Sequence, residues 1–236
     1  MAPRFAALLD PPIGFAHRGA RAHARENTLE AFALARRLGA TGLESDVWIS
    51  RDGVAILDHD GEVGSRFKRR PIIEVDRADL PGHMPTLAEF YAEIGTDLPV
   101  SLDLKDDRAI EAVIAAARHA DASEQLWLCH HSRKPLTDWR HRFPEVKLVN
   151  STRAQLMQEG AERRAADLAE MGIDAVNLRH DDWSGGMVAM FHRFGILAFG
   201  WDAQFERHLD GLLDIGIDAV YSDHVDRMVD SINAVY

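Results

Sequence analysis

The chain has 236 residues, and 38 acidic against 27 basic side chains give it a formal net charge of −11. This balance disfavours a nucleic-acid backbone or an anionic membrane surface as the main partner, because both attract a net basic face. No window approaches 18 apolar residues, the apolar run at 5–9 is too short for a signal peptide, and the single cysteine, Cys129, excludes an intrachain disulfide. We therefore expect a cytoplasmic protein with no nucleic-acid partner and no stable membrane association.

Short apolar runs alternate with longer amphipathic segments along the whole chain, which is typical of an α/β protein with a parallel sheet. The predicted strands, in chain order, are residues 13–17, 43–48, 54–57, 100–104, 126–129, 147–149, 175–178, 196–201 and 219–222. The predicted helices are residues 28–38, 86–94, 108–119, 153–171, 186–194, 205–215 and 225–234.

About eight strand–helix units in one chain favour a closed (β/α)8 TIM barrel over an open sheet, since a complete barrel typically takes about 250 residues. No Gly/Ser linker or block of charge divides the chain, so we expect one domain spanning residues 1–236. The least regular stretch, 60–84, is interpreted as a loop or a short insertion after the second strand region. Its basic triplet at 68–70 is interpreted as a solvated loop face rather than a binding site.

Carboxylates gather where the predicted strands end, and in a barrel of this kind the active site lies at those ends. Glu44 and Asp46 are two residues apart on a strand and so point to the same face, and Asp103 has the same relation to Lys105. Buried carboxylates without a His or Cys pair indicate one hard divalent cation, Mg²⁺ or Ca²⁺. An ion-pair network with Lys105 and Arg18 as counter-charges is the alternative interpretation.

Two histidines, His17 and His59, also close apolar runs, and imidazoles flanking a reacting group can act as general acid and base. Arg18 and Lys105 add the positive charge that a phosphoryl group requires. Trp201 ends a strand and is predicted either to pack in the core or to form a wall for the substrate. Glu26, just before a helix start, either belongs to the cap or reaches back to orient His17 or Arg18.

These residues resemble the glycerophosphodiester phosphodiesterase family. The similarity spans about residues 13–230 and includes its His-Arg-Gly, Glu-Asn-Thr, Glu-x-Asp, His-Asp, Pro-Thr-Leu-x-Glu and Glu-x-Lys patterns. They correspond here to His17-Arg18-Gly19, Glu26-Asn27-Thr28, Glu44-Ser45-Asp46, His59-Asp60, Pro85-Thr86-Leu87-Ala88-Glu89 and Asp103-Leu104-Lys105.

The resemblance implies a TIM barrel that cleaves a small-molecule glycerophosphodiester to sn-glycerol 3-phosphate and an alcohol with the help of a metal. It implies that Glu44, Asp46 and Asp103 are the metal ligands and that Arg18 contacts the phosphate. His17 and His59 would be the acid/base pair, and Lys105 would match the lysine of the family pattern. A lysophospholipase D-type activity, a catalytically silent barrel that binds a phosphorylated metabolite, and assembly into a homo-oligomer all stay open.

The sequence departs from the family pattern in four places. Asp103 stands where Glu is usual, Arg25 replaces Pro, His224 stands where Tyr or Lys is common, and Trp201-Asp202-Ala203-Gln204 replaces Trp-Thr-Val-Asn. Asp202 is therefore predicted either to point inward, where it would read a cationic head group beside Trp201, or to point outward and cap the helix that starts near Phe205.

Overall fold

The computed structural model describes residues 5–65 and 68–236. The strands that build the main sheet are β1 (Ile13–Ala16), β2 (Gly42–Ile49), β3 (Ala55–Leu57), β6 (Val100–Leu104), β7 (Leu126–His130), β8 (Lys147–Ser151), β9 (Ala175–Arg179), β10 (Leu197–Trp201) and β11 (Ala219–Ser222). The helices are α1 (Leu29–Arg37), α2 (Leu87–Ile94), α3 (Ile110–His119), α4 (Arg133–Arg142), α5 (Ala161–Glu170), α6 (Gly185–Arg193), α7 (Glu206–Asp214) and α8 (Val225–Asn233). Within those described ranges, no helix has the length and apolar character that crossing a lipid bilayer requires.

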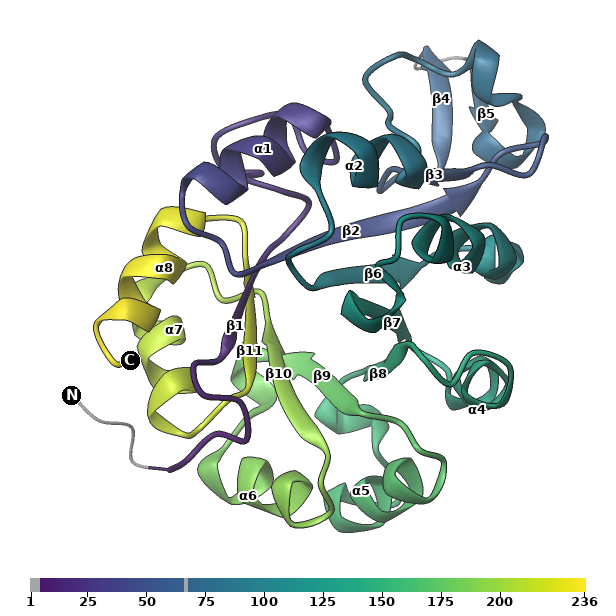
Figure 1. Ribbon diagram of the computed structural model, residues 1–236. Coiled ribbons are helices and arrows are strands. Elements are labelled where there is room, and N and C mark those ends of the chain that lie inside the picture. Colours follow the sequence, from purple (N-terminus) through teal and green to yellow (C-terminus); the bar gives the residue numbers. More distant parts are fainter. Residues whose placement is uncertain (1–4, 66–67) are drawn as a thin grey trace.

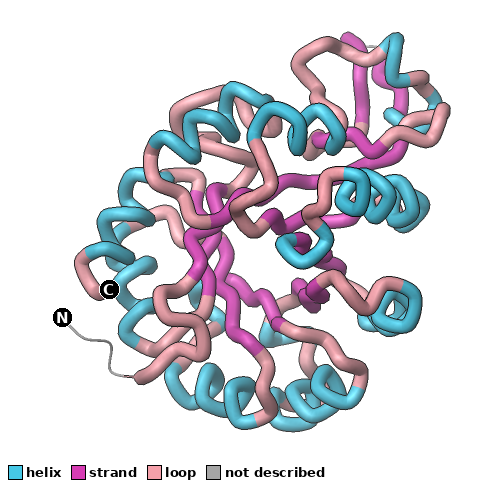
Figure 2. The backbone as a smooth tube through the Cα atoms, viewed as in Figure 1, coloured by secondary structure: helices cyan, strands magenta, loops and turns pink. Residues whose placement is uncertain are grey.

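The strands close into a barrel. In the described part of the chain, one nine-stranded sheet has the order β1-β11-β10-β9-β8-β7-β6-β2-β3, and a further pairing of β1 with β2 completes the ring. All neighbouring strands are parallel except β2 and β3. With β3 set aside, each barrel strand leads to a helix on the outside (Figures 1 and 2). The predicted (β/α)8 TIM barrel is confirmed.

Three elements differ from the sequence prediction. The run at 54–57 is not a barrel strand: β3 turns back antiparallel along the end of β2, with Val47 opposite Leu57. Helix α4 was not predicted, because its sequence is mostly charged and buries only Leu136 and Trp139. The predicted helix at 153–171 is two pieces, a short 3-10 turn at Ala154–Leu156 and α5, which begins after Gly160 with its positive φ of 86°.

The insertion after β2 is a small appendage. Strands β4 (Glu62–Ser65) and β5 (Lys68–Pro71) pair as an antiparallel hairpin that stands beyond the end of β2 (Figure 1). The predicted basic triplet at 68–70 lies on β5 and is exposed, as expected for a solvated face. Two residues of the predicted insertion, 66–67, lie outside the described residues. Apolar side chains beneath the hairpin form a separate small cluster: Ile56, Ile72, Val75, Leu80 and Met84.

Alternation along the strands divides the core into two layers. Leu43, Leu102 and other outward-facing residues pack against the helices, in the larger cluster. The inward-facing positions fill the barrel interior with the aromatic or branched side chains of Phe15, Trp127, Val149, Phe199 and Tyr221. Because the side-chain period of a strand is two, the next inward position beyond each of these faces the C-terminal mouth of the barrel. This register places the polar residues discussed below at one end of the barrel.

Candidate active site

A cavity of about 480 Å³ opens at the C-terminal ends of the barrel strands. Its floor is the hydrogen-bonded group of Ser101, Cys129 and Tyr221, in which the Ser101 hydroxyl lies 3.0 Å from Tyr221 Oη and 3.2 Å from Cys129 Sγ. Its walls come from seven of the barrel strands and the loops that follow them: His17, Arg18, Arg21, Glu44, Asp46, Asp103, Lys105, Ser151, Asn177, Trp201, Asp202, Gln204 and Asp223. Seven of the eight predicted site residues are among them, so a single cavity collects nearly the whole predicted set.

Glu44 and Asp46 form the most buried part of the wall, with 6% and 2% of their surfaces exposed. Glu44 Oε2 accepts a hydrogen bond from the Arg18 backbone N–H at 2.8 Å. Burial raises the pKa of Glu44 and the neighbouring Asp46 carboxylate raises it further, although the His17 and Arg18 charges oppose both effects. Asp46 Oδ2 lies 3.1 Å from Arg18 Nε, but neither atom has a hydrogen-bond partner among the described residues. Two neighbouring buried carboxylates, one of them with an oxygen that accepts no hydrogen bond, fit a hard cation.

Lys105 lies between Asp46 and Asp103. Its ammonium is 3.1 Å from Asp46 Oδ1 and donates a hydrogen bond to Asp103 Oδ2. Burial lowers the pKa of Lys105, but the Asp103 and Asp46 carboxylates outweigh it and the pKa is raised, so the ammonium stays charged. Among the described residues, Glu44, Asp46 and Asp103 do not form a group with ligand atoms all within 4.8 Å of one another. The predicted cation ligands therefore share the cavity without converging, and the predicted ion-pair network joins two of them.

His17 is held between two carboxylates. Its Nδ1 lies 2.6 Å from Asp223 Oδ1, and its Nε2 lies 3.8 Å from Glu44 Oε2. Burial of the ring lowers the pKa of His17, but the Glu44 charge and the hydrogen bond to Asp223 outweigh it, so the pKa is raised. Burial likewise acts to raise the pKa of Asp223, yet the bond to His17 leaves it lowered. The protonated form of His17 is thus favoured at this position.

Asp223 was given no role from the sequence, although its position could have been inferred. It follows the inward-facing Ala219 and Tyr221 at intervals of two, and it comes directly after β11, the neighbour of β1. Its backbone N–H donates to Gln204 Oε1 at 2.9 Å, which holds it at the cavity wall. The same period of two extends from Val149 to Ser151 and from Ala175 to Asn177, and both of these cavity residues were also missed.

The loop after β1 presents Arg18 to the cavity. Arg18 adopts a left-handed φ of 52°, which is uncommon for a residue with a side chain and typical of functional turns. Its guanidinium donates to Glu26 Oε2 at 3.1 Å. The Thr28 hydroxyl accepts the Ala31 N–H at the start of α1. Both interpretations of this segment hold, because Glu26 orients Arg18 while Thr28 provides the cap.

The predicted site residue that does not line the cavity is His59. Its side chain is 38% exposed, and its Nδ1 pairs with Asp60 Oδ1 at 2.9 Å. The segment is still close to the site, because the Asp58 N–H donates to the Asp46 carbonyl at 3.1 Å. The antiparallel course of β3 explains this placement, since it returns the chain toward the mouth at the edge of β2. The sequence predicted that His17 and His59 face one cavity, but in this structure only His17 of the two lines it.

Asp202 faces the cavity, and its charge already has a partner. Arg179 Nε donates to Asp202 Oδ2 at 2.9 Å. Helix α7 has Phe205 at its N-cap and no side-chain cap, so the prediction that Asp202 caps this helix is wrong.

Trp201 also lines the cavity and packs on the inner apolar cluster, with the Arg153 guanidinium 6.0 Å from its ring centre. Both interpretations of Trp201, core packing and substrate wall, are compatible with this position.

Comparison with known proteins identifies the family. The sequence profile of the glycerophosphoryl diester phosphodiesterase family matches residues 17–227, which is most of the chain and includes every residue that lines the cavity. The chain belongs to this family. The resemblance noted from the sequence motifs is thereby confirmed. As a member of the glycerophosphoryl diester phosphodiesterase family, the chain differs from the usual pattern at Asp103, whose carboxylate accepts a hydrogen bond from Lys105.

The chain is also similar in sequence to individual members of this family. The chain is 29% identical over 154 residues to the glycerophosphodiester phosphodiesterase of Caldanaerobacter subterraneus subsp. tengcongensis, covering 56% of this chain and 63% of that protein. It is 50% identical over 54 residues to glycerophosphodiester phosphodiesterase 1 of Rattus norvegicus, covering 23% of this chain and 16% of that protein. The matches therefore span less than two thirds of the length of these relatives.

Solved structures of similar proteins share the fold. The glycerophosphodiester phosphodiesterase of Thermotoga maritima matches with a TM-score of 0.80 and 23% identity, covering 93% of this chain and 97% of that one. An Oleispira antarctica phosphodiesterase, solved in complex with its product sn-glycerol-3-phosphate, matches with a TM-score of 0.82 and 23% identity, covering 94% and 97%. At this identity the likeness concerns the barrel itself.

Proposed function

We propose that this protein hydrolyses glycerophosphodiesters to sn-glycerol 3-phosphate and an alcohol. The observation that carries the proposal is His17, bonded to Asp223 and facing Glu44, in a cavity that also presents Arg18, Lys105 and further carboxylates. Family membership and the names of the relatives support the same activity. The Oleispira antarctica protein, whose structure contains the product sn-glycerol-3-phosphate, supports this class of substrate.

One divalent cation, Mg²⁺ or Ca²⁺, would be held by Glu44 and Asp46, with Asp103 as the proposed third ligand. The buried Asp46 Oδ2 supports this assignment, because it accepts no hydrogen bond and has only the Arg18 guanidinium beside it, so a cation would offset the cost of its burial. When bound, the cation would neutralise charge on the phosphoryl oxygens. Asp103 would first have to leave the hydrogen bond with Lys105.

The cationic side chains would bind the phosphoryl group. Arg18 and Lys105 both reach the carboxylates on β2, so a phosphate between them would exchange these contacts for its own oxygens. Trp201, at the cavity wall, would cover the apolar part of the substrate. These basic side chains lie among carboxylates of the same cavity, which agrees with the acidic charge of the whole chain.

His17 is proposed as the general acid. Its Nδ1 is bonded to Asp223, which leaves Nε2 as the atom that exchanges a proton with substrate. In the first step the 2-hydroxyl of the glycerol attacks phosphorus, the bond to the alcohol oxygen breaks, and His17 protonates the leaving alkoxide. His59, at the mouth, would accept the hydroxyl proton after its ring turns from Asp60 toward the cavity. Water then opens the cyclic phosphate with the two roles reversed.

The activity can be tested by identifying the product. Purified protein is incubated with glycerophosphocholine, glycerophosphoethanolamine, glycerophosphoglycerol and lysophosphatidylcholine, and the products are followed by ³¹P NMR. We expect sn-glycerol 3-phosphate from at least one of the first three and none from an Asp46→Asn variant. Cleavage of lysophosphatidylcholine alone would replace this function with the lysophospholipase D type. No turnover of any substrate by the folded protein would favour a silent, ligand-binding barrel.

A further inference from the structure

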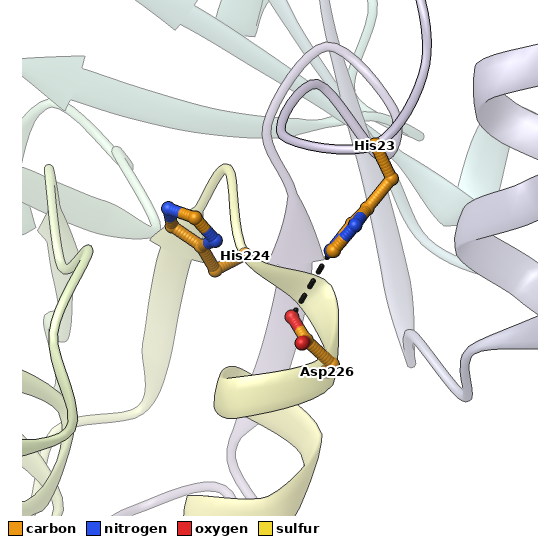
Figure 3. A group of neighbouring side chains, drawn as sticks. All are labelled: His23, His224 and Asp226. Atoms are coloured by element: carbon orange, nitrogen blue, oxygen red, sulfur yellow. Dashed lines mark hydrogen bonds and ion pairs between the residues drawn. The ribbon is translucent and has the colours of Figure 1, made fainter.

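A second cluster of possible ligands lies outside the cavity, where the loop after β1 meets the start of α8. His23 comes from that loop, His224 from the turn after β11, and Asp226 from the first turn of α8 (Figure 3). One ligand atom from each lies within 4.8 Å of the other two. Among the residues that the structure describes, this is the one group of three His, Cys, Asp or Glu side chains with that spacing.

The distances approach those of a metal site. His23 Nε2 is 3.1 Å from Asp226 Oδ1, and the His23 and His224 rings meet edge-on with their centres 6.2 Å apart. Bonds of about 2.0–2.2 Å in a tetrahedral site place ligand atoms roughly 3.2–3.6 Å apart. The distance between His23 Nε2 and Asp226 Oδ1 is therefore already close to that of a metal site. Rotation of the His224 ring about its side-chain bonds would bring its nitrogen to a similar distance from both atoms.

The chemistry of this cluster differs from that of the cavity. Two imidazoles with one carboxylate suit ions such as Zn²⁺, Ni²⁺ or Cu²⁺, whereas sets of carboxylates suit Mg²⁺ and Ca²⁺. The side chains of His23 and Asp226 are 36% and 48% exposed, which leaves space for water to complete the coordination sphere. Within the described residues, the His224 ring makes an edge-on contact with the His23 ring but no hydrogen bond, so metal binding would break no hydrogen bond of that ring.

We propose that His23, His224 and Asp226 bind one transition-metal ion of the Zn²⁺ class at a second site, separate from the cavity carboxylates. The ion would join the loop after β1 to the start of α8. These segments already touch through the Ala22 N–H, which donates to the Asp223 carbonyl at 3.2 Å. The site would thus reinforce the junction that holds Asp223 against His17, and a ligand that binds only the folded state raises its stability.

The test is an isothermal titration of the full chain with Zn²⁺. It is made in a Glu44→Gln/Asp46→Asn background, which removes the two most buried cavity carboxylates as competing ligands. We expect one equivalent of Zn²⁺ to bind and the melting temperature to rise with it. Adding His224→Ala should weaken binding by at least about 10-fold, the lower end of the effect seen when even outer partners of metal ligands are lost.

The matched control in the same background is His141→Ala, an exposed histidine on α4 away from the cluster, which should leave Zn²⁺ affinity unchanged. His23→Ala and Asp226→Asn provide second variants if His224→Ala fails to fold, as judged by circular dichroism. Undiminished binding of Zn²⁺ in the folded cluster variants, or no binding in the starting protein, would overturn the proposal. Because the readout is metal binding, its result does not depend on whether the protein has phosphodiesterase activity.

Discussion

The two nitrogens of His17 face different neighbours, and this asymmetry gives the ring a direction. Nδ1 is bonded to Asp223, while Nε2 faces Glu44 across 3.8 Å and opens to the cavity. A carboxylate on one imidazole nitrogen fixes the tautomer and stabilises the imidazolium form. Burial lowers the pKa of His17, but the Glu44 charge and the hydrogen bond to Asp223 together outweigh the effect of burial, so the pKa is raised. His17 is therefore prepared to donate a proton, whereas the more exposed His59 at the rim has only the Asp60 carboxylate beside its ring.

Substituting His17 or His59, the proposed acid and base, should lower activity far more than substituting other histidines. A positioned acid or base contributes about 10²–10⁴-fold, so we expect His17→Ala to lower kcat/KM by that amount. His59→Ala should lose a similar factor if its ring turns into the cavity during turnover. Steady-state kinetics with His83→Ala and His141→Ala as controls measure both effects. Near-normal turnover in His59→Ala would leave His17 without this partner, and near-normal turnover in His17→Ala would refute the assignment of the acid.

The His17–Asp223 pair should also appear in the pH dependence of stability. A folded-state pKa above the unfolded value of about 6.5 stabilises the fold fully below that pH, and the contribution disappears as pH rises through the folded pKa. Asp223→Asn removes the charge that helps to raise this pKa. We therefore expect the loss in free energy of unfolding to be larger at pH 6 than at pH 9, measured by urea denaturation with EDTA present. An equal loss at both values would show that the pair does not titrate as inferred.

Asp202 is paired with Arg179, and this pairing determines how a substitution of Asp202 should affect substrate preference. If the carboxylate were unpaired, it would attract a cationic head group such as choline, but it already accepts a hydrogen bond from Arg179, which also pairs with Asp181. Asp202→Asn should therefore change kcat/KM by the same factor for glycerophosphocholine and for glycerophosphoglycerol, which has no positive charge. The ratio of the two values in variant and unmodified protein is the measurement. A selective loss with glycerophosphocholine would mean that Asp202 recognises the head group after all.

At the scale of the elements, the strands were predicted well because each is a short apolar run with the period of a buried strand. Strands β6 and β11 have the predicted bounds, and the other barrel strands differ by one or two residues at an end. The failures have a local cause. The short link with Asp52-Gly53 between β2 and β3 is typical of a hairpin and too short for a parallel crossover, and this signal was overlooked. The charged α4 buries too few residues to produce an apolar stripe.

Close packing between β1 and β2 gives a test at the same scale. A Cβ added at Gly42 would lie 2.6 Å from the Phe15 ring and 2.7 Å from Ile13 Cγ2, inside the barrel. Gly42→Ala should therefore lower the free energy of unfolding by about 1–3 kcal/mol through overpacking. Gly186→Ala on α6 is the matched control, since nothing lies within 4 Å of its added Cβ, and it should be neutral or slightly stabilising. Urea denaturation compares the two, and similar effects would contradict this description of the barrel interior.

At the scale of the whole molecule, closure of the barrel explains why strand-end residues could be assigned to one site from sequence. Glu44, Asp46, Asp103 and Trp201 come from strands that all end at one mouth, so the fold alone brings them to one cavity. The sequence could not predict which side chains pair between neighbouring barrel strands. His17 and Asp223 are separated by 206 positions and meet because β1 pairs with β11, and Arg179 meets Asp202 because β9 pairs with β10. Such contacts depend on register and rotamer, which no local pattern encodes.

The metal dependence of glycerophosphodiester cleavage is the measurement that bears most directly on the proposed chemistry. Release of sn-glycerol 3-phosphate from the preferred substrate is followed in EDTA and after addition of excess Mg²⁺ or Ca²⁺. We expect EDTA to abolish turnover and one of the two ions to restore it, because Glu44 and Asp46 are neighbouring buried carboxylates whose mutual repulsion a bound cation would offset. Undiminished turnover in the chelator would contradict the assignment of these carboxylates as a catalytic metal site.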